Sequence, residues 1–289
     1  MKAAVSNIVK AEIEAAITMA SDGKRRQEDR VHEVRKTCKK MRALLRLIRQ
    51  CDERMFQHEE SVFRKIARQF AKIREAEVMV DCHDSLLTRF VGEADRGRFA
   101  RLRRRLCAQR RAARESAKSI NARLAQFAGR MRGVGERLPD WSRFIDEPAV
   151  LVSGFVTTYR RARKAMRRAR EEPSDENFHE WRKRAKYHGY QIRLIRGFRK
   201  SLSKIQWGQI EKLWNALGDE HDLTVYRQAL LLGTAEPGSE GERRDMLDLI
   251  DRRRAELREG AMRLGRTIFA GKPSRLGRRL RGQLPRRGI

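Results

Sequence analysis

Residues 31–49 read VHEVRKTCKKMRALLRLIR and residues 178–196 read FHEWRKRAKYHGYQIRLIR, so one basic segment headed by histidine occurs twice. Nine of these 19 aligned positions are identical, at a constant offset of 147 residues. The same offset places REAEV at 74–78 on HDLTV at 221–225. A constant register over nearly 50 residues predicts an internal duplication.

Both copies have the pattern of an amphipathic helix. At about 100° per residue the apolar residues gather on one side, and the cationic residues gather on the opposite side and its flanks. The candidate anion-binding residues of the two copies are the basic and hydrogen-bonding ones, namely His32, Arg35, Lys36, Lys39, Lys40, Arg42, Arg46, Arg49, His179, Arg182, Lys183, Lys186, Tyr190, Arg193 and Arg196. His188 falls on the apolar side and is interpreted as a structural histidine.

A charged helix face is most often an ordinary solvated surface. Such faces mix both signs and carry Glu–Lys pairs one turn apart, whereas like charges three or four residues apart destabilise a helix. Here the stripe has one dominant sign and occurs in both copies, which favours a binding surface. The segment before the second copy, YRRARKAMRRAR at 159–170, adds Arg160, Arg163, Lys164 and Arg167 on one face. We expect this face to pack beside the second copy and to deepen a cationic groove.

The composition points to a polyanionic partner. The 289 residues carry a formal net charge of +30, which repels itself in a compact chain unless a polyanion neutralises it. Nucleic acid, anionic membrane and inorganic polyphosphate are the candidates. Four isolated cysteines, no signal-peptide pattern and no apolar run long enough to span a membrane predict a soluble cytoplasmic protein with reduced thiols.

The long stretches between prolines predict an all-helical protein. Strand alternation and hairpin turns are absent, and the prolines fall at apparent boundaries. Helices are expected at 3–20, 25–50, 54–89, 94–132, 148–171, 175–197, 201–232 and 239–269. The predicted organisation is one four-helix repeat at 1–132, a linker at 133–147, a second four-helix repeat at 148–270 and a disordered basic tail at 271–289.

The motif His-x-x-Arg-x-x-x-Lys with a downstream Leu-Gly-x-x-(Arg/His)-Asp resembles the CHAD family, the conserved histidine α-helical domain. The segments that match this motif are His32 to Lys39, His179 to Lys186, and LGDEHD at 217–222. The resemblance covers about residues 3–270. It implies two pseudo-symmetric four-helix bundles around a basic central groove or cavity that binds inorganic polyphosphate. It also implies an association with polyphosphate granules and with granule-associated proteins.

The first copy departs from that family pattern. It has Arg74-Glu75-Ala76-Glu77 where Arg-Asp-x-Asp is usual, and it lacks the preceding Leu-Gly. In the second copy Tyr187 and Gly189 stand where the first copy has Lys40 and Arg42. The second half is therefore expected to hold phosphate less densely along this helix, with the stripe at 160–167 compensating.

Polyphosphate suits the composition because it is a flexible polyanion without bases. Closely spaced Lys and Arg side chains can bind its phosphate oxygens. A protein with only 7% aromatic residues has few rings on which nucleic-acid bases could stack. Non-catalytic polyphosphate binding is therefore the preferred prediction. A nucleic-acid-binding helical protein stays open as an alternative, although no zinc-finger, RRM or KH signature is present.

An accessory or regulatory subunit of a phosphate-metabolism enzyme is the other alternative. Catalysis by this chain itself is disfavoured, since Glu12-Ile13-Glu14-Ala15-Ala16 lacks the lysine of the Glu-x-Glu-x-Lys signature of CYTH domains. No Walker-type loop or nucleophile elbow is present. Cys82 and His83 lack metal-ligand spacing, so no metal and no cofactor are expected.

Overall fold

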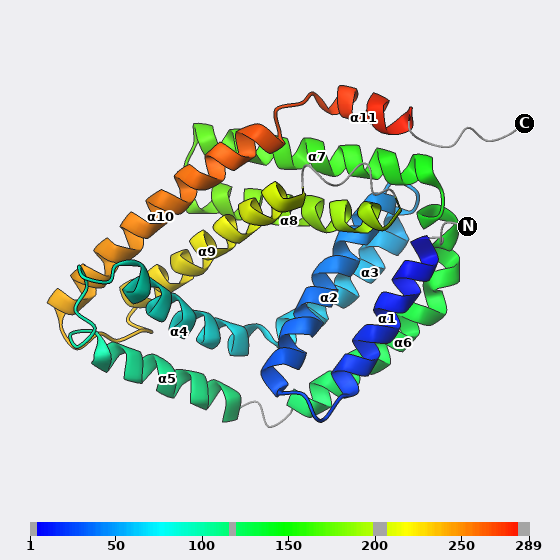
Figure 1. Ribbon diagram of the computed structural model, residues 1–289. Coiled ribbons are helices and arrows are strands. Elements are labelled where there is room, and N and C mark those ends of the chain that lie inside the picture. Colours follow the sequence, from blue (N-terminus) through cyan, green and yellow to red (C-terminus); the bar gives the residue numbers. More distant parts are fainter. Residues whose placement is uncertain (1–4, 116–119, 199–206, 283–289) are drawn as a thin grey trace, which may run out of the picture.

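The computed structural model describes residues 5–115, 120–198 and 207–282, except for the side chains of residues 195–198 and 207. Within these ranges the chain forms helices and no strand, which confirms the all-α prediction (Figure 1). The helices are α1 (Val5–Ser21), α2 (Gln27–Ile48), α3 (Glu53–Gln69), α4 (Ala71–Arg89), α5 (Ala100–Glu115), α6 (Ile120–Ile145), α7 (Pro148–Glu171), α8 (Asp175–Phe198), α9 (Trp207–Leu231), α10 (Glu240–Ile268) and α11 (Pro273–Arg281). None of these helices is long and apolar enough to cross a bilayer.

Several helix starts follow from local chemistry. The Asp52 carboxylate accepts a hydrogen bond from the backbone N–H of Met55 and caps α3. Ser239 caps α10 in the same way through the N–H of Glu242. Prolines stand in the first turns of α7 and α11, where a missing backbone N–H costs no helical hydrogen bond.

The predicted helix at 54–89 is two helices. The chain leaves helical geometry at Phe70, which has φ −108° and ψ 11° and whose side chain is fully buried. The aromatic ring packs into the core at the bend between α3 and α4. Within the predicted helix at 94–132, the described residues form α5 up to Glu115 and α6 from Ile120, and residues 116–119 lie outside the described part of the chain.

The predicted linker at 133–147 is helical as far as Ile145, with Pro139 inside α6. Val134, Leu138, Trp141 and Ile145 are buried along one side of this segment. Proline costs an interior helix about 3 kcal/mol, and burial of a large apolar side chain contributes about 1.5–3 kcal/mol. Packing of four such side chains therefore outweighs the proline, and residues 133–145 continue α6.

The predicted disordered tail at 271–289 contains α11. Leu280 is buried against α7, and Gly277 lies next to the side chain of Val156. These contacts hold a segment whose charge alone had suggested disorder. Residues 283–289 lie outside the described part of the chain.

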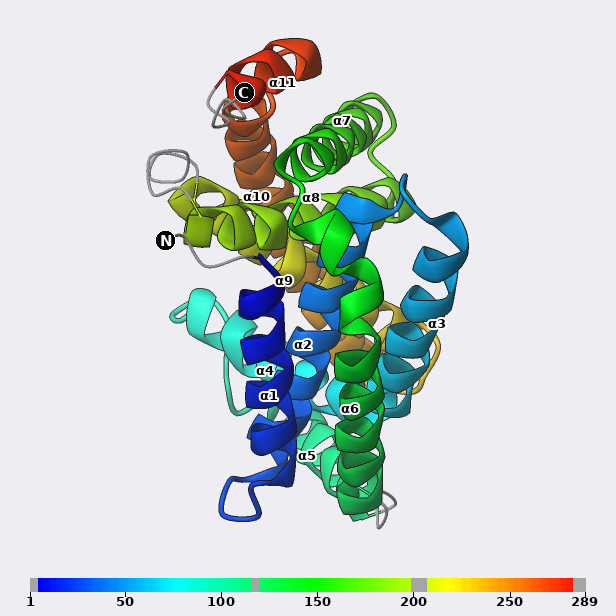
Figure 2. The ribbon, with the colours of Figure 1, turned by 90° about the vertical axis from the view of Figure 1, so that its right-hand side faces the viewer.

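Two hydrophobic clusters form the core, and each draws on both halves of the sequence. The larger one joins α1, α2, α3 and α6 to α7, α8 and parts of α9, α10 and α11. The smaller one joins α4 and α5 to α9 and α10. Figure 2 shows α1, α2 and α6 running side by side, with α7 and α11 at one end of the molecule. The cores therefore do not divide at the expected linker, and a division into two separate bundles stays a prediction.

The repeated helices α2 and α8 pack against each other, and α7 packs across α2. Close approach in this region depends on glycine. A Cβ atom at Gly154 of α7 would collide with the backbone of Leu47 in α2. A Cβ atom at Gly189 of α8 would collide with the Trp214 ring of α9. These small residues let the helices that carry the basic stripes meet around one space.

Candidate polyanion-binding site

A cavity of about 430 Å³ lies where α2, α4, α8 and α9 meet. Both copies of the repeated segment reach it. Its basic lining residues are His32, Arg35, Lys36, Lys39, Arg74, Arg182, Lys186 and His221. The sequence-based expectation of a basic central cavity agrees with this arrangement.

The helix register explains why the two copies face the same space. Arg35 and Lys39 stand one turn apart on α2, and Arg182 and Lys186 stand one turn apart on α8. The apolar sides of both helices are buried in the larger core. Since α2 and α8 pack against each other, their basic sides meet at the cavity.

These four side chains, which we call the central cations, have no carboxylate within ion-pair distance among the described residues. Arg35 donates a hydrogen bond from Nη1 to the carbonyl oxygen of Ala67 at 3.0 Å. The Nε atom of Arg182 is buried and has no hydrogen-bond partner. Buried donors are normally satisfied, so this N–H group is available to a hydrogen-bond acceptor that enters the cavity.

The surroundings of Lys39 and Lys186 in the cavity disfavour the protonated form of both lysines. Burial, followed by the nearby Lys186 and Arg35, lowers the pKa of Lys39 from 10.5 to about 7. Burial, followed by Arg182, lowers the pKa of Lys186 to about 8. Burial also lowers the pKa of Arg35 and Arg182. A bound polyanion would reverse these shifts, because opposite charge favours the cationic form.

Further along α2, the predicted ligands are neutralised instead. Glu60 of α3 is within 2.6 Å of Arg42 and 3.1 Å of Arg46. Glu53 lies 2.7 Å from Arg49. The structure therefore places Arg42, Arg46 and Arg49 in ion pairs outside the central cavity.

One ion pair is repeated in both copies. Lys36 lies 2.8 Å from Glu33, and Lys183 lies 2.6 Å from Glu180 at the matching positions. Lys36 lines the cavity, whereas Lys183 does not. Each lysine thus has a carboxylate of its own helix beside it.

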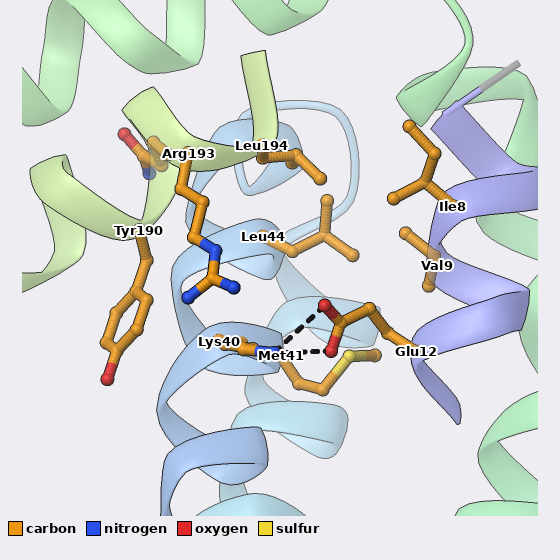
Figure 3. A pocket seen from close by; sticks show the side chains of 10 residues that line it. Ile8, Val9, Glu12, Lys40, Met41, Leu44, Tyr190, Arg193 and Leu194 are labelled. Atoms are coloured by element: carbon orange, nitrogen blue, oxygen red, sulfur yellow. Dashed lines mark hydrogen bonds and ion pairs between the residues drawn. The ribbon is translucent and has the colours of Figure 1, made fainter. Parts of the chain in front are cut away.

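A smaller cavity of about 140 Å³ lies between α1, α2 and α8 (Figure 3). Lys40 pairs with Glu12 of α1 at 2.6 Å, and the Arg193 guanidinium points toward this pair. Tyr190 borders both cavities. Burial raises the pKa of Tyr190 to about 12, so its hydroxyl stays protonated and able to donate.

The two motif histidines have different positions. His32 lines the cavity and is exposed at its rim. His179 lies beside His221, which lines the cavity, with their Nδ1 atoms 3.2 Å apart. Desolvation lowers the pKa of His32 and His179, and burial together with Arg182 lowers that of His221 to about 3. The neutral form of all three rings is therefore favoured, and a neutral ring can donate one hydrogen bond and accept one.

His188 is fully buried, and its ring contacts Phe155, Tyr159 and Phe269. Burial lowers its pKa to about 3, so it is neutral in the folded protein. This placement confirms the prediction that His188 is structural.

Arg74 and His221 were missed by the sequence-based set of ligands. They occupy equivalent positions at the offset of 147 residues, and both line the cavity. Arg74 lies 3.4 Å from Asp81 and 4.0 Å from Asp222. The repeat of 74–78 at 221–225 was the available signal. The same α4 and α9 segments also bring acidic residues to the cavity lining, namely Glu75, Glu77, Asp219 and Asp222.

The stripe of α7 does not deepen the central cavity. Arg160, Arg163, Lys164 and Arg167 line a separate hollow of about 500 Å³ next to Pro273. The helix packs on α8, as expected, but the hollow that this face lines shares no residue with the central cavity. The expected compensation along α8 is therefore not seen in the structure. The side chain of Arg196 lies outside the described residues.

A search of curated proteins found no match to this chain. The CHAD domain matches residues 10–231, a range shorter than the one expected from the motifs. The matched range includes all four helices that line the central cavity. The chain, with its duplicated histidine-headed helices meeting at one basic cavity, belongs to the CHAD domain family.

Proposed function

We propose that this protein binds inorganic polyphosphate in the central cavity without chemically changing it. The observation that carries the proposal is the set of central cations, Arg35, Lys39, Arg182 and Lys186, none of which has a carboxylate within ion-pair distance among the described residues. Burying like charges together costs free energy unless an anion joins them. The family's association with polyphosphate supports the choice of anion.

The side chains that line the cavity favour polyphosphate over nucleic acid as the ligand. Aromatic lining is limited to Tyr190 and Trp214, whose rings pack on each other at 5.2 Å between centroids. Single-stranded nucleic acid is usually held by aromatic rings that stack on its bases. Polyphosphate has no bases and needs only cations and hydrogen-bond donors. The cavity supplies both.

The lining chemistry also supports binding without catalysis. Among the described lining residues there is no serine, threonine or cysteine to act as a nucleophile. His221, which lines the cavity, has its Nδ1 atom 3.2 Å from Nδ1 of His179 and makes no ion pair with a carboxylate among the described residues. We therefore propose that the protein attaches to polyphosphate, including polyphosphate granules, and holds it.

Isothermal titration calorimetry tests the proposal. Orthophosphate, tripolyphosphate and long-chain polyphosphate are titrated into the protein at two salt concentrations. We expect affinity to rise steeply with chain length and to fall with salt, because each bound phosphate releases counterions. The variant Lys39→Met with Lys186→Met should lose about 100-fold in affinity, since each hydrogen bond to a charged group contributes about 1.5–3 kcal/mol.

The matched control is Arg101→Met with Arg104→Met on α5, which removes the same charge from an exposed surface. It should bind nearly as the wild type does. Equal losses in the two variants would show diffuse electrostatic attraction and would refute the cavity site. Equal affinity for orthophosphate and long chains would also refute it.

A further inference from the structure

The helices α7 and α11 form a second basic surface on the outside of the molecule (Figure 1). Their cations are exposed to solvent, unlike the half-buried ones of the central cavity. We define the α7–α11 face by its exposed residues Arg160, Lys164, Arg167, Arg168, Lys272, Arg275, Arg278, Arg279 and Arg281.

This face is held in place by specific contacts. The Tyr159 hydroxyl donates to the carbonyl oxygen of Gly271 at 2.9 Å. The Nε atom of Arg163 donates to the carbonyl oxygen of Phe269 at 2.9 Å. Leu280 is buried against α7. The short segment after α10 is therefore fixed along α7, and the charges of both helices form one surface.

Little of this charge is compensated. Arg168 lies 3.5 Å from Glu172, but most other cations of the face have no carboxylate within ion-pair distance among the described residues. The chain has no acidic residue at all between Gly260 and Gly282. On α2, by contrast, the outer arginines are paired with glutamates of neighbouring helices. An uncompensated patch attracts polyanions.

The α7–α11 face is separate from the central cavity. No residue lines both the central cavity and the hollow on α7. In Figure 1, α8 lies between α7 and the helices on the other side of the cavity. A ligand on the outer face and a ligand in the cavity would therefore not compete for the same side chains.

We infer that the α7–α11 face binds the phosphate backbone of double-stranded nucleic acid without sequence preference. A duplex is too wide for the central cavity but can lie along an exposed helix pair, of which α7 alone is about 36 Å long. Contacts of Lys and Arg with phosphates orient a protein on a duplex and carry no sequence information. This inference does not rest on polyphosphate binding in the cavity.

An anionic membrane fits this face less well. Helices that lie on a membrane insert an apolar face beside their cations. The exposed large apolar residues among the described ones are Val91, Leu231 and Leu232, and none belongs to α7 or α11. The apolar residues of α11 are directed to α7 instead. The face therefore offers charge without an inserting surface.

Fluorescence anisotropy with a labelled DNA duplex of mixed sequence tests the inference. The test variant is Arg160→Gln, Lys164→Gln and Arg167→Gln. Its control is Arg101→Gln, Arg104→Gln and Arg111→Gln, which removes equal charge from exposed positions of α5. We expect the test variant to bind DNA about tenfold more weakly than the wild type, with the control near wild type. The slope of log affinity against log salt should become shallower by about one for each phosphate that the test variant no longer neutralises.

The parallel measurements are tripolyphosphate binding by calorimetry and co-sedimentation with phosphatidylserine vesicles, with circular dichroism melts to check folding. Unchanged tripolyphosphate affinity in the test variant supports two separate surfaces. Equal losses of DNA affinity in both variants would overturn the inference. So would a loss of tripolyphosphate affinity in the test variant, or binding to vesicles in the absence of binding to DNA. If the central cavity does not bind polyphosphate, the wild-type protein will show no tripolyphosphate binding by calorimetry, whatever the result with DNA.

Discussion

The two ends of α2 carry similar charge but have different surroundings. At one end Arg35 and Lys39 face the central cavity without a carboxylate partner among the described residues. At the other end Arg42 and Arg46 share Glu60 of α3. A basic stripe therefore indicates a binding site only where the surrounding helices leave it uncompensated. The compensated end fixes α3 on α2, and the uncompensated end is available to a ligand.

The largest expected effect is on stability at the compensated end. Replacement Arg42→Ala with Arg46→Ala leaves the Glu60 carboxylate, which is 14% exposed, without its partners. Loss of both partners from a mostly buried charge should lower the free energy of unfolding by about 2–3 kcal/mol. The melting temperature should fall by about 5–10 °C in a thermal scan.

Adding Glu60→Gln to that variant serves as the control, because it removes the stranded charge. This triple variant should regain part of the lost stability. Polyphosphate affinity should change far less than in the central-cation variants. A melting temperature unchanged from wild type would show that the ion pairs of Glu60 contribute nothing to the fold.

At the uncompensated end, substitution should have opposite effects on stability and on binding. Lys39→Met removes a half-buried cation that is repelled by its neighbours and keeps a similar side-chain volume. The melting temperature should rise by about 2–4 °C. Polyphosphate affinity should fall by about tenfold, the loss of one hydrogen bond to a charged group. A melting temperature below that of the wild type would contradict the idea that Lys39 is repelled by neighbouring cations in the folded protein.

The pH dependence of stability should also reveal the central lysines. The pKa of Lys39 is about 7 in the folded protein and near 10.5 in the unfolded chain. Between these values the unfolded chain binds more protons, so the free energy of unfolding should rise with pH. Below pH 7 both states are protonated and the full repulsion remains. Lys186, with a pKa of about 8, acts in the same direction.

Denaturant titrations from about pH 7 to about pH 7.5 measure this slope before thiols of the unfolded chain ionise, since a free cysteine has a pKa of about 8.5. The variant Lys39→Met with Lys186→Met should show a flatter slope. Polyphosphate should bind with uptake of protons at about pH 8, seen by calorimetry in buffers of different ionisation enthalpy, and affinity should fall as pH rises. Binding without proton uptake would place the ligand away from these lysines.

The smallest expected effect concerns the motif histidines. His32→Ala with His179→Ala should lower polyphosphate affinity severalfold with little change in melting temperature, because His32 is at the rim and His179 supports His221. Wild-type binding should tighten as pH falls from about 8 to about 6, since a bound polyanion favours imidazolium. Unchanged affinity together with a clearly lower melting temperature would make both histidines structural.

Much of the site was visible in the chain before any tertiary structure. The register of the two copies predicted that Arg35 and Lys39 correspond to Arg182 and Lys186, and all four line one cavity. The repeat at 74–78 and 221–225 also carried the signal for Arg74 and His221. The stripe on α7 had an equally strong pattern but lines a different hollow. Periodicity places residues on one face of a helix and does not say which neighbour that face meets.

The sequence by itself determined the helical class, the repeat of the histidine-headed segment and the sign of the charge, because these depend on local periodicity and composition. Tertiary structure decided which cations are free to bind. The neutralising carboxylates Glu12 and Glu60 come from other helices, and their reach depends on how α1 and α3 pack on α2. Packing also kept Pro139 within a helix and ordered α11, since burial of apolar side chains outweighed the local signals of proline and charge.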